Sequence, residues 1–260
     1  LHFSFFLKNF KNEENKNILQ EIYDYNFRQL ELSIREIGYG DVSCNGAKRI
    51  DTPHIDNLAA QGLRFKSGYC SASTCTPTRY SFLTGTYAFR KTGTGIAPPN
   101  SPAIIQPSTQ TIASLLKKAG YTTQVIGKWH LGPSPKAQGF DVAVEHNKIP
   151  GMRGHKGKNG EYLTDLLTER TLDFIGEKSN KPWCAYLSHY AVHTPLQAKN
   201  KIISKYQKKG SGKLHRDPVM AAMIQSVDEG VGRLVAKLHK SEQRNNTVIL
   251  FFSDNGGYGP

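Results

Sequence analysis

Apolar residues along this chain follow two different periods. Apolar runs at 183–187 and 247–252 predict buried strands, and the β-branched content and length of the run at 121–126 predict a third. Apolar residues that recur every three or four positions predict helices; these segments are 108–119, 161–175 and one that begins near 217. Helices that alternate with buried strands favour an α/β domain built as three layers, α/β/α.

Start and stop residues support the predicted helices. Thr52 and Pro53 suit the beginning of a further short helix, and Gly62 suits its end. Asp217 and Pro218 suit the beginning of the longest helix, in which Met and Leu residues recur at helical spacing. We interpret this stripe as a core-facing side and not as a cofactor site.

One segment combines a cysteine with residues that begin a helix. It runs from Cys75 through Pro77 and Arg79 to Gly85. Proline is tolerated in the first helical turn and glycine ends helices, so Cys75 is expected at or just before a helix N-terminus, which favours anions. A buried thiol beside a surface arginine is the plainer alternative. The partners present elsewhere in the chain decide between the two.

Polar side chains follow each of the predicted strands. Lys128 and His130 follow the first, His193 follows the second, and Asp254 and Asn255 follow the third. If the backbone stays extended from Lys128 to His130, both side chains lie on one face. A surface patch and an Asp-Asn-Gly turn are the ordinary alternatives. Open α/β sheets bind ligands beyond the carboxyl ends of their strands, so we expect these residues and the cysteine in one crevice.

Four segments together resemble the type I sulfatases, and bacterial arylsulfatases in particular. In chain order they are Cys75–Gly85, Gly127–Gly132, Trp183–Pro195 and Thr247–Gly257. The resemblance implies an alkaline-phosphatase-like fold, a three-layer α/β/α sandwich around a central, mostly parallel mixed sheet. It also implies arylsulfatase-like hydrolysis of sulfate esters, on a sulfated small molecule or a sulfated glycan.

The resemblance assigns a role to each catalytic group. Cys75 would be oxidised to formylglycine by the formylglycine-generating enzyme, and the hydrated aldehyde would attack sulfur. Arg79 would support the modified side chain and its charge, while Lys128 would hold a sulfate oxygen. His130 would orient or deprotonate the second hydroxyl of the hydrate, and His193 would assist the leaving oxygen.

The resemblance also implies a divalent cation, Ca²⁺ or Mg²⁺. Asp254, Asn255 and the modified Cys75 would be its ligands, because hard cations prefer oxygen donors. In the family, two further aspartates usually precede Leu-Gly-Tyr-Gly-Asp. This chain has Arg35 and Glu36 at that place. Glu36 is the carboxylate that remains there, and the positive charge of Arg35 opposes a cation.

The chain divides where the resemblance begins. Residues 1–36 form an atypical N-terminal segment, and residues 37–260 match a sulfatase catalytic domain that stops before the rest of that domain and its C-terminal subdomain. We therefore expect a fragment. Residues 1–36 are either a divergent sequence with an altered metal site, or the product of a partial or frame-shifted gene sequence. The return of the motif after Ile37 favours the second, and an Asp-Asp encoded in another frame upstream of Gly38 would establish it.

The chain is basic, with 34 Lys and Arg residues against 21 Asp and Glu residues and a net charge of +13. Basic residues concentrate at 199–216 and at 148–158. Solvated loops are the plainer explanation; our hypothesis is that both clusters border the crevice and attract sulfated polysaccharide. No nucleic-acid-binding motif accompanies them, so we expect no nucleic-acid partner.

The remaining sequence features limit the class of protein. The four cysteines, at positions 44, 70, 75 and 184, fit neither a zinc site nor a disulfide scaffold. No apolar run reaches the ~18 residues of a membrane span. The resemblance suggests a periplasmic or secreted location. Two alternatives stay open: a phosphonate or phosphodiester hydrolase of the same superfamily, and an inactive sulfoglycan-binding homologue, to which Arg35 and Glu36 point.

Overall fold

The secondary structure alternates between strands and helices along most of the chain. A computed structural model describes residues 6–7, 28–98, 102–132, 134–177, 181–210 and 216–257. Its strands are β1 (Phe6–Leu7), β2 (Arg28–Ile34), β3 (Leu63–Arg64), β4 (Thr122–Gly127), β5 (Val142–Glu145), β6 (Trp183–Ser188) and β7 (Thr247–Ser253). Its α-helices are α2 (Pro53–Ala60), α3 (Cys75–Thr84), α4 (Ile112–Lys118), α5 (Leu163–Glu177), α6 (Asn200–Lys208) and α7 (Pro218–Lys240).

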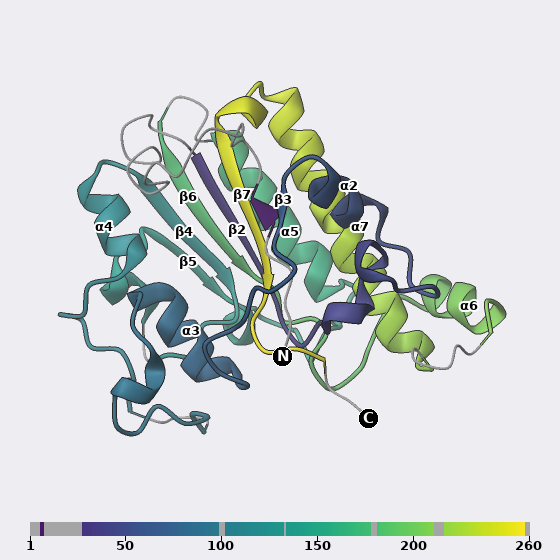
Figure 1. Ribbon diagram of the computed structural model, residues 1–260, viewed down its shortest axis with the longest axis horizontal. Coiled ribbons are helices and arrows are strands. Elements are labelled where there is room, and N and C mark those ends of the chain that lie inside the picture. The colour runs from purple at the N-terminus through teal and green to yellow at the C-terminus, as the bar shows by residue number, and fades with distance from the viewer. Residues whose placement is uncertain are drawn as a thin grey trace.

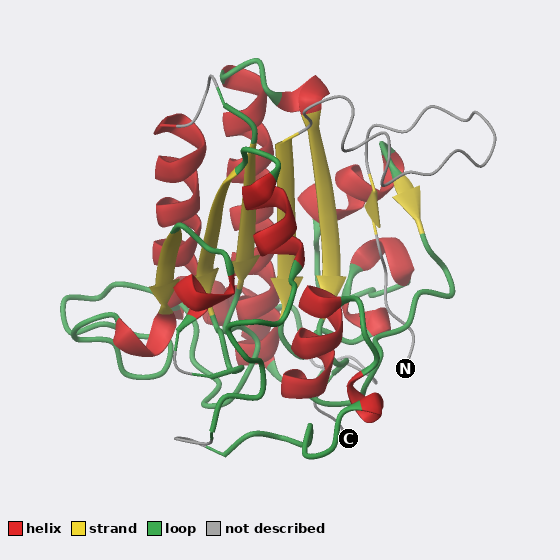
Figure 2. Ribbon diagram, turned by 90° about the vertical axis from the view of Figure 1, so that its left-hand side faces the viewer, coloured by secondary structure: helices red, strands yellow, loops and turns green. Residues whose placement is uncertain are grey.

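The strands form one sheet between two layers of helices. Within the described residues the strand order is β3-β1-β7-β2-β6-β4-β5, in which β7 to β5 are parallel and β1 pairs antiparallel with both of its neighbours, β7 and β3. Helices α2, α5 and α7 contribute to the core on one face, and α3 and α4 contribute to the core on the other (Figures 1 and 2). The predicted three-layer sandwich with a mostly parallel mixed sheet is confirmed.

Most of the predicted elements are present with small shifts at their ends. The helix predicted over 108–119 begins later, at Ile112, because the Thr111 side chain caps it by accepting the Ser114 N–H at 3.0 Å. The Asp217 carboxylate caps α7 by accepting the N–H of Val219 at 2.7 Å, as the sequence predicts. No helix in the described part of the chain is long and apolar enough to cross a membrane.

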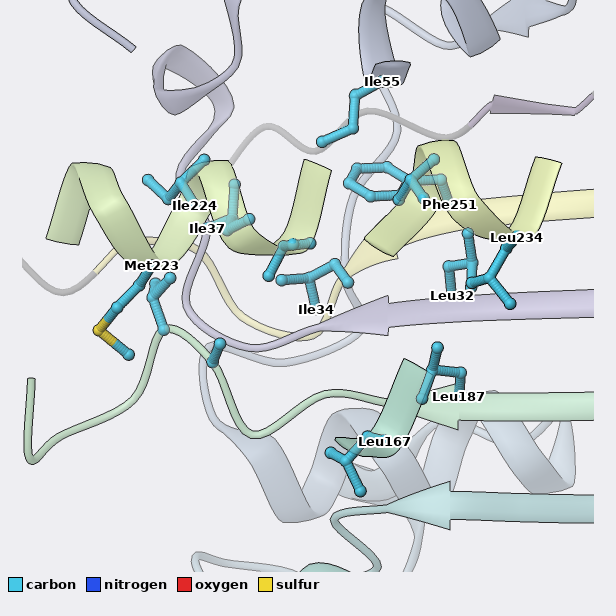
Figure 3. Packing of buried hydrophobic residues seen from close by; sticks show 14 of the residues in the cluster. Leu32, Ile34, Ile37, Ile55, Leu167, Leu187, Met223, Ile224, Leu234 and Phe251 are labelled. Carbon is cyan, nitrogen blue, oxygen red and sulfur yellow. The ribbon is translucent and has the colours of Figure 1, made fainter. Parts of the chain in front are cut away.

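Strand β2 lies at the centre of the sheet, between β7 and β6, although it was not predicted from the sequence. Its apolar residues alternate with polar ones. Leu32 and Ile34 join the core beside α7, where Leu234 and Phe251 also lie (Figure 3). Glu31 is buried as well, with its side chain on the opposite face of the strand. A central strand with one polar face therefore carries the chain into Arg35 and Glu36.

The buried carboxyl group of Glu31 makes the stability of the fold depend on pH. Burial raises the pKa of Glu31 to about 8, whereas the same group in an unfolded chain has a pKa of about 4.3. The folded state therefore keeps a proton that the unfolded state releases, so the free energy of unfolding falls as pH rises between those values.

We expect Glu31→Gln to remove this dependence, because the amide does not ionise. From pH 5 to pH 7, urea unfolding of the wild type should show a loss of about 2 kcal/mol that the variant lacks. Equal pH dependence in both proteins would show that Glu31 does not keep its proton in the fold.

Candidate functional site

Backbone hydrogen bonds continue past the ends of the parallel strands and align the residues that follow them. The N–H of Asp254, just after β7, donates to the last carbonyl of β2 at 3.0 Å, and the N–H of Lys128, just after β4, donates to the last carbonyl of β6 at 2.8 Å. The first N–H after β6 donates to Ser33 of β2 at 2.9 Å. The residues that follow these four strands therefore lie side by side at one edge of the sheet.

Cys75 is the first residue of α3, which reaches this edge of the sheet. Thr74 is the N-cap, and Gly85 ends the helix in a left-handed conformation with φ of 66°. The position predicted for Cys75, at a helix N-terminus, is confirmed, and its side chain is buried. All four cysteines are free thiols.

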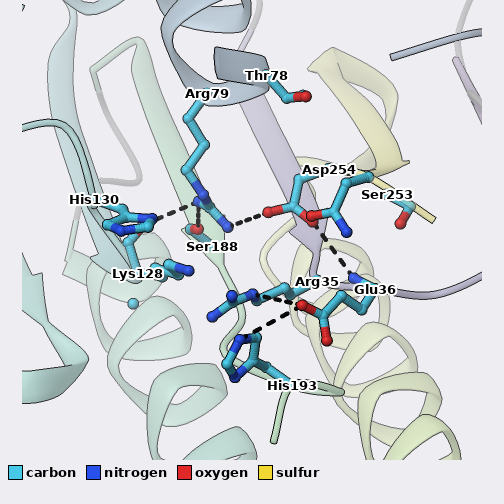
Figure 4. Close-up of polar contacts among 12 residues, drawn as sticks. Arg35, Glu36, Thr78, Arg79, Lys128, His130, Ser188, His193, Ser253 and Asp254 are labelled. Carbon is cyan, nitrogen blue, oxygen red and sulfur yellow. Dashed lines mark hydrogen bonds and ion pairs between the residues drawn. The ribbon is translucent and has the colours of Figure 1, made fainter. Parts of the chain in front are cut away.

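Arg79 joins α3 to the ends of three strands (Figure 4). Its Nη2 donates to Asp254 Oδ2 at 2.7 Å, and its Nη1 donates to the Lys128 carbonyl at 3.0 Å and to Ser188 Oγ. Both side chains of the Arg79–Asp254 ion pair are almost completely buried. Arg79 therefore fixes the position of the helix that carries Cys75, besides placing a positive charge near it.

Lys128 presents a buried ammonium group to the site. Its side chain lies close enough to Cys75 and Asp254 for their charges to act on it. Burial, with the charges of Arg79 and Arg35, lowers the pKa of Lys128 to about 7. An anion placed beside this group would be bound best by its protonated form.

The backbone at His130 is left-handed and not extended. Its φ is 61°, so the extended conformation considered for 128–130 is wrong. A carbonyl only accepts, so Nε2 donates to Ala97 O at 2.9 Å and Nδ1 accepts the Thr76 hydroxyl at 3.2 Å. Burial, then the charge of Lys128, lowers the pKa of His130 to about 4. His130 is therefore held neutral, against the residue next to Cys75.

His193 and Glu36 meet across the site (Figure 4). His193 Nδ1 donates to the Thr194 carbonyl at 2.6 Å, which turns Nε2 toward Glu36 Oε1 at 3.5 Å. Burial, then the charge of Arg35, lowers the pKa of His193 to about 4, while burial raises the pKa of Glu36. Both shifts favour the uncharged forms of the two groups.

Two of the residues predicted to bind a cation, Asp254 and Glu36, are engaged with other partners. Asp254 accepts Arg79 on one oxygen and the Glu36 N–H, at 3.4 Å, on the other. Asn255 Oδ1 is buried without a hydrogen-bond partner, as a cation ligand would be. Glu36 turns to Arg35 and His193. No group of three or more His, Cys, Asp or Glu side chains among the described residues could hold a metal ion.

Calcium takes six to eight oxygen ligands, and this donor set as it stands does not fit a divalent cation. Cation binding by Asp254, Asn255, Cys75 and Glu36 stays a prediction.

Two site residues were not singled out in the sequence. The Tyr190 ring stacks on His146 at 4.5 Å between ring centroids and contacts the His193 ring at 5.1 Å. The Arg35 guanidinium lies 5.5 Å from the same ring. Tyr190 follows β6 by two residues, so its place at a strand end was the available signal. His146 follows β5, a four-residue strand that the apolar pattern does not reveal.

A pocket of about 560 Å³ opens beside Lys128 and His130. Lys128 and His130 line it together with the turn His146–Lys148 and residues 102–104. Lys148 thus borders the pocket, as predicted for one basic cluster. In the other cluster, Lys199 pairs with Asp165, and Lys205 and Lys209 pair with Asp51, so part of its charge is neutralised.

The comparisons with known proteins show the family of the chain. The sulfatase family model matches residues 35–259. An N-acetylgalactosamine-6-O-sulfatase of Bacteroides thetaiotaomicron is 31% identical, with 85% of this chain and 57% of that protein covered. Arylsulfatase J of Mus musculus is 32% identical, with 85% and 41% covered. The chain spans about half the length of the curated relatives it matches.

Solved structures show the same fold. The crystal structure of Ps i-CgsB superposes with a TM-score of 0.77 at 30% identity and covers 89% of this chain and 59% of that one. The sandwich is the alkaline-phosphatase-like fold that the sequence motifs imply. The family model covers most of the chain and the fold is the one found in solved sulfatase relatives, so the chain belongs to the sulfatase family.

Proposed function

We propose that the protein containing this chain hydrolyses sulfate esters and uses residue 75, converted from cysteine to formylglycine, as its nucleophile. The position of Cys75 carries the proposal. It is buried at the first turn of α3, in the electrostatic neighbourhood of Arg79 and Lys128. A helix N-terminus and two cationic side chains favour an anionic group such as a sulfate ester at this point.

The surrounding side chains supply the other parts of the reaction. Formylglycine, as its hydrate, would supply a hydroxyl nucleophile for sulfur. Lys128 binds a sulfate oxygen, and Arg79 holds α3 against the strand ends. Neutral His130 accepts a proton through its Nδ1 side, where Thr76 now lies. His193, whose Nε2 faces Glu36 at 3.5 Å, would assist the leaving oxygen.

Sulfated glycans are the substrate class that we favour. The Bacteroides relative is named an N-acetylgalactosamine-6-O-sulfatase, and the pocket beside Lys128 has room for a sugar ring next to the sulfate. Maturation by a formylglycine-generating enzyme and a periplasmic or secreted location belong to this proposal. Sulfatases generally use a formylglycine and a divalent cation, and a calcium titration tests whether Asp254 and Asn255 bind one here.

Turnover of two substrates tests the proposed reaction directly. The protein, co-expressed with a formylglycine-generating enzyme, should hydrolyse an aryl sulfate with a kcat/KM well above that for the matching aryl phosphodiester. The reverse preference would favour the phosphonate and phosphodiester hydrolases of the same superfamily.

An inactive sulfoglycan-binding protein is the second candidate. The observation that favours it is the pair Arg35 and Glu36 at the end of β2, where they form an ion pair at 3.3 Å. Binding of a sulfated glycan without turnover, in protein with confirmed oxidation of Cys75, would establish that function.

The lowered pKa of Lys128 predicts how activity depends on pH. With a pKa of about 7, the ammonium group loses its charge above neutral pH and with it the attraction for sulfate. The value of kcat/KM for an aryl sulfate, which reports on the free enzyme, should fall by about tenfold per pH unit above that pKa.

A Lys128→Arg variant tests the assignment, because a guanidinium stays charged throughout this range. Its pH–rate profile should lack the descending limb near neutral pH. If both proteins show the descending limb at the same pH, the limb reports the titration of a group other than Lys128.

A further inference from the structure

Arg35 is buried in the site, next to Tyr190, and its backbone is fixed by hydrogen bonds. It is 6% exposed. Its N–H donates to Ala191 O at 2.9 Å, and its carbonyl accepts the Val192 N–H at 2.7 Å, so the loop after β6 fixes its backbone on both sides. The guanidinium lies over the Tyr190 ring and points toward Lys128 (Figure 4).

The positive charge around Arg35 is only partly compensated. Glu36 Oε1 lies 3.3 Å from Arg35 Nε, but Nε is buried without a hydrogen-bond partner. The Lys128 side chain is 5% exposed, and we find no acceptor for its ammonium group in the described part of the chain. The site thus contains three cationic side chains, Arg35, Arg79 and Lys128. Only two carboxyl groups, those of Glu36 and Asp254, lie among them. Buried charge without a partner is costly, so an anion bound here would relieve it.

The same geometry disfavours a divalent cation. The Glu36 carboxyl group turns away from Asp254 and toward Arg35 and His193 (Figure 4). Asp254 already accepts the Arg79 guanidinium. A cation at Asn255 would therefore find one free amide oxygen, one carboxylate shared with an arginine, and a neighbouring positive charge on Arg35.

We propose that Arg35 and Lys128 form an oxyanion site that binds the sulfate group of the substrate without a divalent cation. The guanidinium offers parallel N–H donors to two oxygens of a tetrahedral oxyanion, and the ammonium group binds a third. Arg35 thus takes over charge compensation that a cation would otherwise supply. This inference rests on the proposed function for the identity of the ligand as a sulfate ester, and it adds which residues bind it.

Calorimetric titration with inorganic sulfate tests the site directly. At fixed ionic strength, because salt screens these interactions, sulfate should bind in EDTA with a Kd that changes by less than about twofold when calcium replaces EDTA. Binding that requires calcium, or that tightens tenfold or more with calcium, would overturn the proposal.

Variants at position 35 separate the guanidinium from the rest of the site. Arg35→Ala should weaken sulfate binding at least about tenfold, and Arg35→Lys, which keeps the charge, should recover part of the loss. Arg170→Ala removes an equal charge from an exposed position on α5 and should leave the Kd unchanged. Unchanged binding by Arg35→Ala, in protein whose circular dichroism matches the wild type, would overturn the proposal.

The double variant Arg35→Asp, Glu36→Asp tests the converse. It places two carboxylates beside Asp254 and Asn255, so calorimetry should show one bound calcium that the wild type lacks. Calcium binding at one site of the wild type with the same affinity would contradict the inference.

Failure of the inference and failure of the proposed function give different results. Turnover of aryl sulfate that EDTA abolishes would keep the function and overturn the cation-free site. Sulfate binding that depends on Arg35, without turnover by the oxidised protein, would keep the site and overturn the hydrolase function.

Discussion

Replacing Cys75 with alanine is expected to abolish turnover of an aryl sulfate, with kcat lowered by roughly 10⁴-fold or more. Alanine has no sulfur to oxidise, so the variant lacks both the aldehyde and the hydroxyl nucleophile derived from it. Cys75 is buried at the first turn of α3, and the loss of one sulfur atom there removes little packing. The assay is steady-state hydrolysis by protein co-expressed with a formylglycine-generating enzyme.

Cys184→Ala is the matched control for this prediction. Cys184 is also a buried free thiol, but it lies within β6 and belongs to a separate packing cluster with Leu116 and Tyr121. Its replacement should leave kcat within about twofold of the wild type. Turnover by the Cys75→Ala variant at a rate similar to that of the control would exclude Cys75 as the source of the nucleophile.

Replacing Arg79 with methionine is expected to lower the free energy of unfolding by about 3 to 5 kcal/mol. The substitution keeps much of the side-chain volume, but it leaves the buried Asp254 carboxylate without its partner at 2.7 Å. It also removes the donors to Ser188 and to the Lys128 carbonyl. Urea unfolding measures the loss.

An exposed ion pair provides the control for Arg79. Lys117 and Asp141 pair at 2.6 Å with side chains 51% and 31% exposed, and such pairs contribute about 1 kcal/mol or less. Lys117→Met should therefore be nearly neutral. If the added change Asp254→Asn restores no stability to Arg79→Met, the cost does not come from the unpaired carboxylate.

The sequence predicted the strands with apolar or β-branched runs. Strands β6 and β7 read as continuous apolar runs, because helices cover both sides of the sheet, and β4 was recognised by its β-branched residues. Strand β2 does not form such a run, because Gln29, Glu31 and Ser33 interrupt its apolar residues. Its central place comes from hydrogen bonds to β6 and β7, which local composition does not encode.

Helices were predictable where capping residues mark them. Pro77 and Gly85 bracket α3, and Asp217 begins α7. Helix α6 was missed because its three lysines and polar residues resemble a solvated loop, although Ile202 and Tyr206 are buried on one side of it. Here tertiary packing of two residues outweighs the composition of the segment.

The sequence predicted which residues lie together in the site, but not which of their side chains contact one another. The residues after the strands converge because parallel strands end at one edge of the sheet. The backbone turn at His130, the ion pair of Glu36 with Arg35 and the contact of Glu36 with His193 depend on side-chain conformations in the assembled fold. Arg35 was read as an obstacle to a cation, and its buried position against Tyr190 gives it a role as an anion ligand in our proposal.

The mass of the peptide that carries residue 75 tests the central claim most directly. The protein is co-expressed with a formylglycine-generating enzyme beside a sulfatase known to be converted in the same cells, and both are digested and analysed by mass spectrometry. We predict that the peptide carries formylglycine and its hydrate in place of the cysteine thiol. An intact Cys75 thiol in protein that hydrolyses an aryl sulfate, while the control sulfatase is converted, would contradict the account.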